Sequence, residues 1–143
     1  MTNPSHEALG CRELASSSAR YVVVHEAAVA DFDAIEERKQ ARLLRVMELW
    51  CEGQRLSEEQ FNGNEGRAKH GNISVLLQAF KTHKIRLYGI DSNIRGYRTF
   101  IIVEIDGAKK QNKADPKVLK RAKESAIAML DALNTVNEDG KNG

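Results

Sequence analysis

The side chains best suited to chemistry in this sequence are basic and aromatic, and they follow one another along residues 84–90. Apolar residues alternate there with Lys84, Arg86 and Tyr88, which is the period-two pattern of a half-buried strand. These three side chains are therefore expected on the outer face of one strand. Such a face is suited to contact with a polyanion. The alternative is that the cations only solubilise the strand and the tyrosine caps the sheet edge.

Further candidates lie on both sides of this strand. Two turns at residues 62–66 and 71–72, rich in Gly and Asn, enclose a basic segment, but their spacing matches no P-loop. A polar loop at residues 109–113 carries three lysines, and an arginine begins the next strand. Two histidines are placed to titrate near neutrality. The residues concerned are Arg67, Lys69, His70, His83, Arg98, Lys109, Lys110 and Lys113.

The charge distribution places these candidates in one basic block. Residues 62–123 hold 14 Lys and Arg against 5 Asp and Glu, although the whole chain has a net charge of only +2. Residues 1–61 hold 7 against 11, and residues 124–143 hold 1 against 4. A basic block between acidic flanks favours a polyanion such as RNA over a small-molecule substrate. A basic surface that is merely solvated is the alternative.

The elements that must position these residues follow from hydrophobic periodicity. The β-branched run at 21–24 predicts a strand, and residues 27–52 predict one helix or a helical hairpin that ends at Gly53. Residues 91–93 are expected to form the turn of a hairpin whose second strand covers 98–105. Asp115 and Pro116 are expected to begin a final helix with an apolar face through Leu133.

This order predicts an α+β fold, a small antiparallel sheet with an N-terminal helix or helical hairpin and a C-terminal helix, with the helices on one side. A continuous parallel sheet is disfavoured because the late strands lie too close together for helical crossovers. We expect one domain over residues 20–133. Residues 1–19 are expected to form a mobile or loosely docked arm, and residues 134–143 a polar tail that frays.

The remaining composition limits the class of protein. Cys11 and Cys51 have neither a metal-binding spacing nor the density of a disulfide framework, and Cys51 is expected to be a buried, reduced thiol. No secretory signal and no apolar run of about 20 residues is present. The sequence therefore predicts a cytoplasmic protein with no membrane contact and no metal site.

Several of these segments together resemble a known family. Residues 73–80 (ISVLLQAF) and 84–89 (KIRLYG) look like successive strands of RelE/HigB-like toxins, the second with an Arg and a Tyr. Residues 100–103 (FIIV), 108–116 (AKKQNKADP) and 119–122 (LKRA) are similar to the phage-related HigB-type branch of the RelE/ParE superfamily, where an apolar strand runs into a Lys-Lys-x-x-Lys loop. The resemblance covers roughly residues 20–133.

The resemblance implies the toxin of a type II toxin–antitoxin pair, a metal-independent endoribonuclease without cofactors that cleaves messenger RNA, usually on the ribosome, and is inhibited by a cognate antitoxin protein. It implies that Arg86 faces the phosphate and that Tyr88 stacks on a base or shares proton chemistry. His83, a histidine of the same basic segment, completes the candidate catalytic set. RNA-binding roles fall to Lys84, Arg98, Lys109, Lys110, Lys113, Arg67, Lys69 and His70.

Two other functions remain open at this point. A non-catalytic member of the superfamily could act by binding a protein, as ParE-type relatives do on DNA gyrase. A generic nucleic-acid-binding module without a toxin role is the other. Both fit a chain that ends in a helix and a polar tail, because many active members place a catalytic residue near a C-terminal strand.

Overall fold

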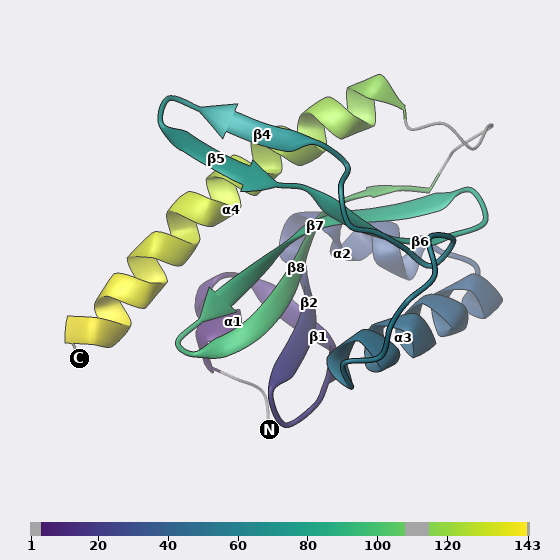
Figure 1. Ribbon diagram of the computed structural model, residues 1–143, viewed down its shortest axis with the longest axis horizontal. Helices are drawn as coiled ribbons and strands as arrows, with labels where there is room; N and C mark the ends of the chain where they lie inside the picture. The colour runs from purple at the N-terminus through teal and green to yellow at the C-terminus, as the bar shows by residue number, and fades with distance from the viewer. Residues whose placement is uncertain (1–3, 108–114, 143) are drawn as a thin grey trace.

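The computed structural model describes residues 4–107 and 115–142 of the chain (Figure 1). Four helices and eight strands are assigned within those residues. The helices are α1 (Pro4–Ala8), α2 (Glu26–Asp33), α3 (Glu37–Cys51) and α4 (Pro116–Asn142). The strands are β1 (Cys11–Ser16), β2 (Arg20–His25), β3 (Phe61–Asn62), β4 (Arg67–His70), β5 (Ile73–Leu76), β6 (Gln78–Thr82), β7 (Ile85–Ile94) and β8 (Tyr97–Asp106).

A six-stranded sheet in the order β1-β2-β8-β7-β6-β3 forms the centre of the fold, and β4 and β5 form a separate two-stranded sheet. The class is α+β, as expected, but the sheet is larger than expected and mixed. The expectation of a purely antiparallel sheet was wrong because β2 pairs in parallel with β8, with Val22 opposite Phe100. The other neighbours in the large sheet are antiparallel.

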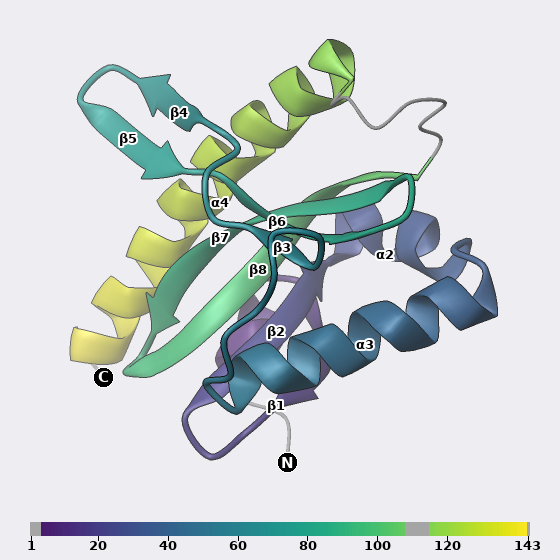
Figure 2. The ribbon, with the colours of Figure 1, turned by 45° about the vertical axis from the view of Figure 1, so that its right-hand side comes forward.

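Helices cover both faces of the large sheet rather than one (Figures 1 and 2). On one face α2 and α3 pack through residues such as Phe32 and Met47, and on the other α4 packs through residues such as Met129. Neighbouring residues of β8 therefore enter different cores, since Ile101 belongs to the core with α4 and Ile102 to the core with α2 and α3, and both are fully buried. Because both faces of β8 are buried, this strand needs a continuous run of apolar residues, which residues 100–103 (FIIV) supply.

The two ends of the chain are more ordered than the sequence indicated. In place of a loosely docked arm at residues 1–19, the described part forms α1 and an edge strand, β1, in which Cys11 pairs with His25. Leu9, Cys11 and Ala15 are buried there. At the other end α4 continues to Asn142, and buried Val136 extends its apolar face beyond Leu133. The expected polar tail from residue 134 is helical instead.

The segment 27–52 is a helical hairpin, one of the two expected alternatives. It divides at Ala34–Glu36, just before the polar run that suggested a break, and α3 ends where Gly53 adopts a φ of +79°. Asp115 begins α4 as expected, because its carboxylate accepts a hydrogen bond of 2.9 Å from the Lys117 amide. Within the described residues no helix is long and apolar enough to cross a membrane.

The expected turn at residues 91–93 lies inside β7, which continues to Ile94. The hairpin instead turns at Arg95 and Gly96, which both have positive φ values. Asn93 still serves the turn because its side-chain oxygen accepts a 2.8 Å hydrogen bond from the Gly96 amide. Asp91 pairs across the hairpin with Arg98. The turn-forming residue types thus stabilise the hairpin from within its strand.

Candidate nucleic-acid interface

An open groove of about 780 Å³ lies between α3 and the β6–β7 hairpin. Its lining holds five Lys or Arg residues, one His and one Glu. The cations and the histidine are Arg42, Arg45, Lys81, His83, Lys84 and Arg86. A groove with low-dielectric walls whose charge is predominantly positive concentrates its field on an anion. We call it the basic groove.

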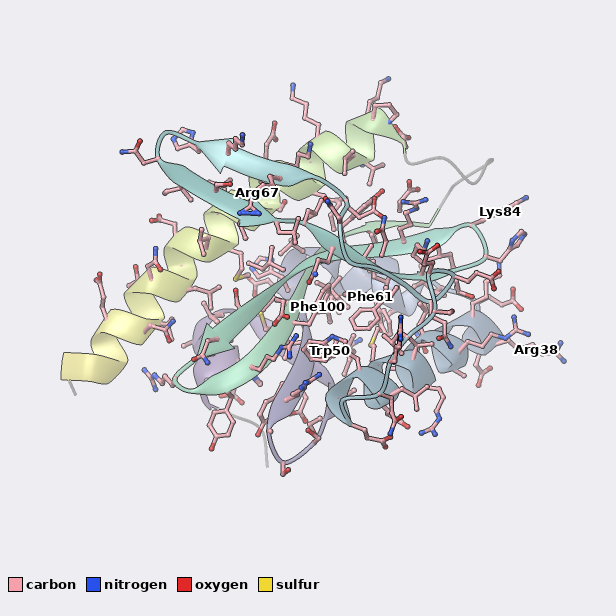
Figure 3. The ribbon with its side chains drawn as sticks, in the orientation of Figure 1. Arg38, Trp50, Phe61, Arg67, Lys84 and Phe100 are labelled. Carbon is pink, nitrogen blue, oxygen red and sulfur yellow. The ribbon has the colours of Figure 1, made fainter. Side chains whose placement is uncertain are left out.

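Two elements supply the walls of the basic groove. Arg42 and Arg45 are three residues apart on α3 and therefore project from the same side of the helix. Lys81 lies in β6, and His83 and Lys84 form the tip of the hairpin opposite α3. Figure 3 shows Lys84 at this tip, on the same side of the molecule as Arg38 near the start of α3.

Apolar side chains complete the lining of the basic groove. Val46 and Leu49 reach it from α3, and Ile85 reaches it from the first position of β7. Val46 and Ile85 also belong to the core between α3 and the sheet. The surface between the two charged walls therefore rests on the packed interior and is preformed.

Most of the groove's positive charge has no carboxylate partner. Within the described residues, Arg42, Lys81 and Lys84 take part in no ion pair, whereas Arg45 pairs with Glu48 at 3.0 Å. The Arg45–Glu48 pair is more than half exposed on both sides, and such pairs hold their partners weakly. The wall residues are thus available to an external anion.

Lys84 has a backbone conformation that is unusual for a residue with a side chain. Its φ is +61°, and within the described part of the chain Arg95 is the one other non-glycine residue with positive φ. The left-handed region costs an L-residue about 1–2 kcal/mol. Both residues are cations at hairpin tips, and Lys84 is the one that lines the basic groove.

Arg86 lines one end of the basic groove, but its guanidinium is engaged within the protein. Its Nη1 donates to Oε1 of Glu65 at 2.6 Å, and the two side chains are only 16% and 5% exposed. The expectation of an outward-facing arginine was therefore wrong. Arg86 neutralises a buried carboxylate that lies between β3 and β4, which is a structural role.

Tyr88 does not lie on a solvent-facing surface. It is fully buried in the core beneath α4, on the sheet face opposite α3. Burial, together with the negative charge of Glu65, raises the pKa of its phenol to about 12, while Arg86 opposes the shift. A buried phenol cannot stack on a base, so the predicted contact between Tyr88 and RNA is not available in this structure.

The other predicted residues are dispersed. Arg67, Lys69 and His70 lie on β4, away from the basic groove. Arg98 is bound to Asp91 at 2.7 Å, with its guanidinium carbon 5.2 Å from the centre of the Trp50 ring. Lys109, Lys110 and Lys113 lie outside the described residues. Of the eleven predicted site residues, His83, Lys84 and Arg86 are brought together in the basic groove.

Sequence reasoning missed Arg42, Arg45 and Lys81. Lys81 belongs to the basic block, but the two arginines lie in the N-terminal segment, whose net charge is negative. The spacing of Arg38, Arg42 and Arg45 could have indicated them, because residues three and four apart share one side of a helix. A net charge summed over a long segment hides such a cationic helix face.

Comparison with known proteins identifies no relative of this chain. No family model, no curated protein and no solved structure matches the chain. Membership of the RelE/ParE superfamily is therefore a prediction from sequence resemblance. Among the residues that the structure describes, no group of three or more His, Cys, Asp or Glu side chains could hold a metal ion.

Proposed function

We propose that this protein binds single-stranded RNA in the basic groove. The observation that carries the proposal is the convergence of Arg42, Lys81 and Lys84 from two elements on one groove, without carboxylate partners within the described residues. Phosphate groups are the anions that such a row of cations neutralises, and release of their counterions drives binding.

The shape of the basic groove favours a single strand over a duplex. It is open, and its volume is in the range of pockets that enclose a drug-sized molecule, so a few nucleotides fit and a double helix does not. Val46, Leu49 and Ile85 can contact sugars and bases between the charged walls. The described lining contains no Phe, Tyr or Trp, so we expect binding to depend on phosphate contacts rather than on base stacking. The choice of RNA over DNA rests on the family resemblance.

Removing one cation from each wall tests the proposal. We expect the double change Arg42→Ala and Lys84→Gly to weaken binding of a short single-stranded RNA roughly tenfold at low salt. The slope of log affinity against log salt should become shallower by about 1.4, since each phosphate contact to a single strand contributes about 0.7. Fluorescence anisotropy of a labelled oligonucleotide across a salt series measures both quantities.

Arg95→Gly is the matched control for this measurement. Arg95 is also an exposed cation with positive φ at a hairpin tip, but it lies at the opposite end of β7 from Lys84. Glycine relieves the left-handed conformation in both variants, so neither should lose stability. The control removes one charge, so it is compared with Lys84→Gly alone. Equal loss of affinity in these two single variants would show that net charge alone drives binding, which would reject the groove as the site.

A second function, RNA cleavage by a type II toxin, is favoured by the position of His83. This residue is exposed and lies between Lys81 and Lys84 on the groove wall. In the metal-free reaction a base removes the proton of a ribose 2′-hydroxyl and the 2′-oxygen attacks the adjacent phosphorus. The bond to the 5′-oxygen then breaks as that oxygen gains a proton, leaving a 2′,3′-cyclic phosphate. An imidazole can make one of these proton transfers while the neighbouring cations stabilise the crowded phosphate.

We expect His83→Gln to lower the rate of RNA cleavage about 100-fold or more and to leave RNA affinity unchanged. Mapping of RNA ends after incubation with purified protein, and in cells after induced expression, measures cleavage.

Growth arrest with intact messages would instead favour a partner protein as target. Binding without cleavage or arrest would leave an RNA-binding module. A cognate antitoxin is expected to be an acidic protein that covers the basic groove.

A further inference from the structure

A second cationic surface lies on the two-stranded sheet formed by β4 and β5. Arg67, Lys69 and His70 are exposed along β4, and Lys123 of α4 reaches the base of the same strand. The ammonium of Lys123 lies 3.3 Å from the position that a Cβ atom would take on Gly66. Arg67 and Lys69 share the outer face of β4, and we call these two residues the ribbon surface.

The ribbon surface is held rigidly. Two backbone hydrogen bonds join Leu77 to the segment just before β4. The Glu65 amide donates to the Leu77 carbonyl oxygen at 2.7 Å, and the Leu77 amide donates to the Gly66 carbonyl oxygen at 2.8 Å. The ion pair between Glu65 and Arg86 also links the segment just before β4 to β7. Ala68 is 2% exposed and belongs, with Val75 packed against it, to the core that includes residues of α4. Figure 1 shows β4 and β5 beside α4. The outer face of β4 is therefore presented in one orientation.

The cations of the ribbon surface are arranged to meet an external anion. Arg67 and Lys69 are two positions apart on one strand, so both point away from Ala68 and α4, with Cα atoms about 7 Å apart. Arg67 is oriented by a 3.0 Å hydrogen bond from its Nε to the Ser74 hydroxyl. Within the described residues, none of Arg67, Lys69 and Lys123 forms an ion pair.

The ribbon surface is separate from the basic groove. Figure 3 shows Arg67 above the large sheet, on the side of α4, and Lys84 at the far tip of the β6–β7 hairpin. Between them the ion pair of Glu65 and Arg86 is nearly buried. An anion bound in the groove therefore does not reach β4. Each surface must bind a separate stretch of the ligand.

From this arrangement we propose that the ribbon surface is a second binding site for the phosphate backbone of the same RNA, so that the protein's substrates are RNAs long enough to span both surfaces. The inference rests on the proposed function of the basic groove. A protein partner suits the ribbon surface less well because protein interfaces have an apolar core. The one exposed large hydrophobic side chain among the described residues is Tyr97, at the far end of β8.

The test uses two RNA lengths and the whole chain of 143 residues. A single strand of about 6 nucleotides fills one site, whereas one of about 20 nucleotides exceeds the 4–16 typical of a single binding fold. The double change Arg67→Gln and Lys69→Gln should weaken binding of the longer RNA roughly tenfold and make its salt slope shallower by about 1.4. The shorter RNA should bind this variant as it binds the unmodified protein.

The groove variant Arg42→Ala and Lys84→Gly distinguishes failure of this inference from failure of the proposed function. It should weaken the binding of both RNAs. If it does so while the ribbon variant binds the longer RNA normally, the ribbon surface is not a site and the groove is retained. If the ribbon variant weakens both RNAs equally, two separate sites are rejected. If the groove variant changes neither RNA, the proposed function itself fails. Thermal unfolding of each variant confirms that the fold is retained.

Discussion

Replacing Arg86 with alanine is expected to lower the free energy of unfolding by about 3–5 kcal/mol. The change would leave the Glu65 carboxylate, whose side chain is 5% exposed, without the guanidinium that lies 2.6 Å away. An uncompensated charge in that position is costly because little water can reach it. Equilibrium unfolding in denaturant, followed by circular dichroism, measures the loss.

The partner residue provides the matched comparison. Glu65→Ala should destabilise the protein to a similar extent, because it leaves the Arg86 cation partly buried. The double change Glu65→Met and Arg86→Met should recover most of the stability, since a buried pair can often be replaced by apolar side chains at little cost. If Arg86→Ala unfolds like the unmodified protein but abolishes RNA cleavage, Arg86 has the catalytic role that the sequence predicted, and the structural interpretation is wrong.

Gly89→Ala is expected to lower the free energy of unfolding by more than about 3 kcal/mol. A Cβ atom at this position would lie 2.3 Å from the backbone oxygen of Ile101 and 2.5 Å from a ring carbon of Phe100. Neither neighbour can move easily, because both belong to the central strand β8 and are fully buried. Gly89 also lies at the irregularity where β7 and β8 change register. The two longest strands must separate or slip to admit a methyl group.

Gly107→Ala is the control for this prediction. Gly107 follows the end of β8, and no atom of the described residues lies within 4 Å of the position that a Cβ atom would take there. The change should therefore stay within about 0.5 kcal/mol. Thermal and denaturant unfolding of the two variants under the same conditions give the comparison. Similar stability of Gly89→Ala and the unmodified protein would contradict the pairing of β7 with β8 in which Gly89 lies opposite Ile102.

Local patterns in the sequence were sufficient for several elements. The β-branched run at 21–24, the apolar strand at 98–105 and the capped helix at Asp115 all lie where expected. Each depends on neighbouring residues: strand propensity in the first two, and a side-chain hydrogen bond to a nearby amide in the third. For residues 27–52 the sequence did not distinguish one helix from a helical hairpin, because the break at Ala34–Glu36 contains no glycine or proline.

The same local reasoning misplaced Arg86 and Tyr88. Alternation of apolar and polar residues indicates that two faces differ, but it does not state what covers the polar one. Here α4 and the segment before β4 cover it, so the arginine meets Glu65 and the phenol enters a core. The partners of these residues come from elsewhere in the chain, and no spacing within the strand encodes them.

By itself the sequence determined the α+β class, most of the long elements and a concentration of positive charge between residues 62 and 123. Only the tertiary structure decided which cations lie together. It buried one of them against Glu65, placed Arg67 and Lys69 on a separate ribbon, and added Arg42 and Arg45 from a segment with net negative charge. The physical reason is that charge along a chain is a sum over residues. A binding surface depends instead on which side chains the packing of distant helices and strands leaves exposed together.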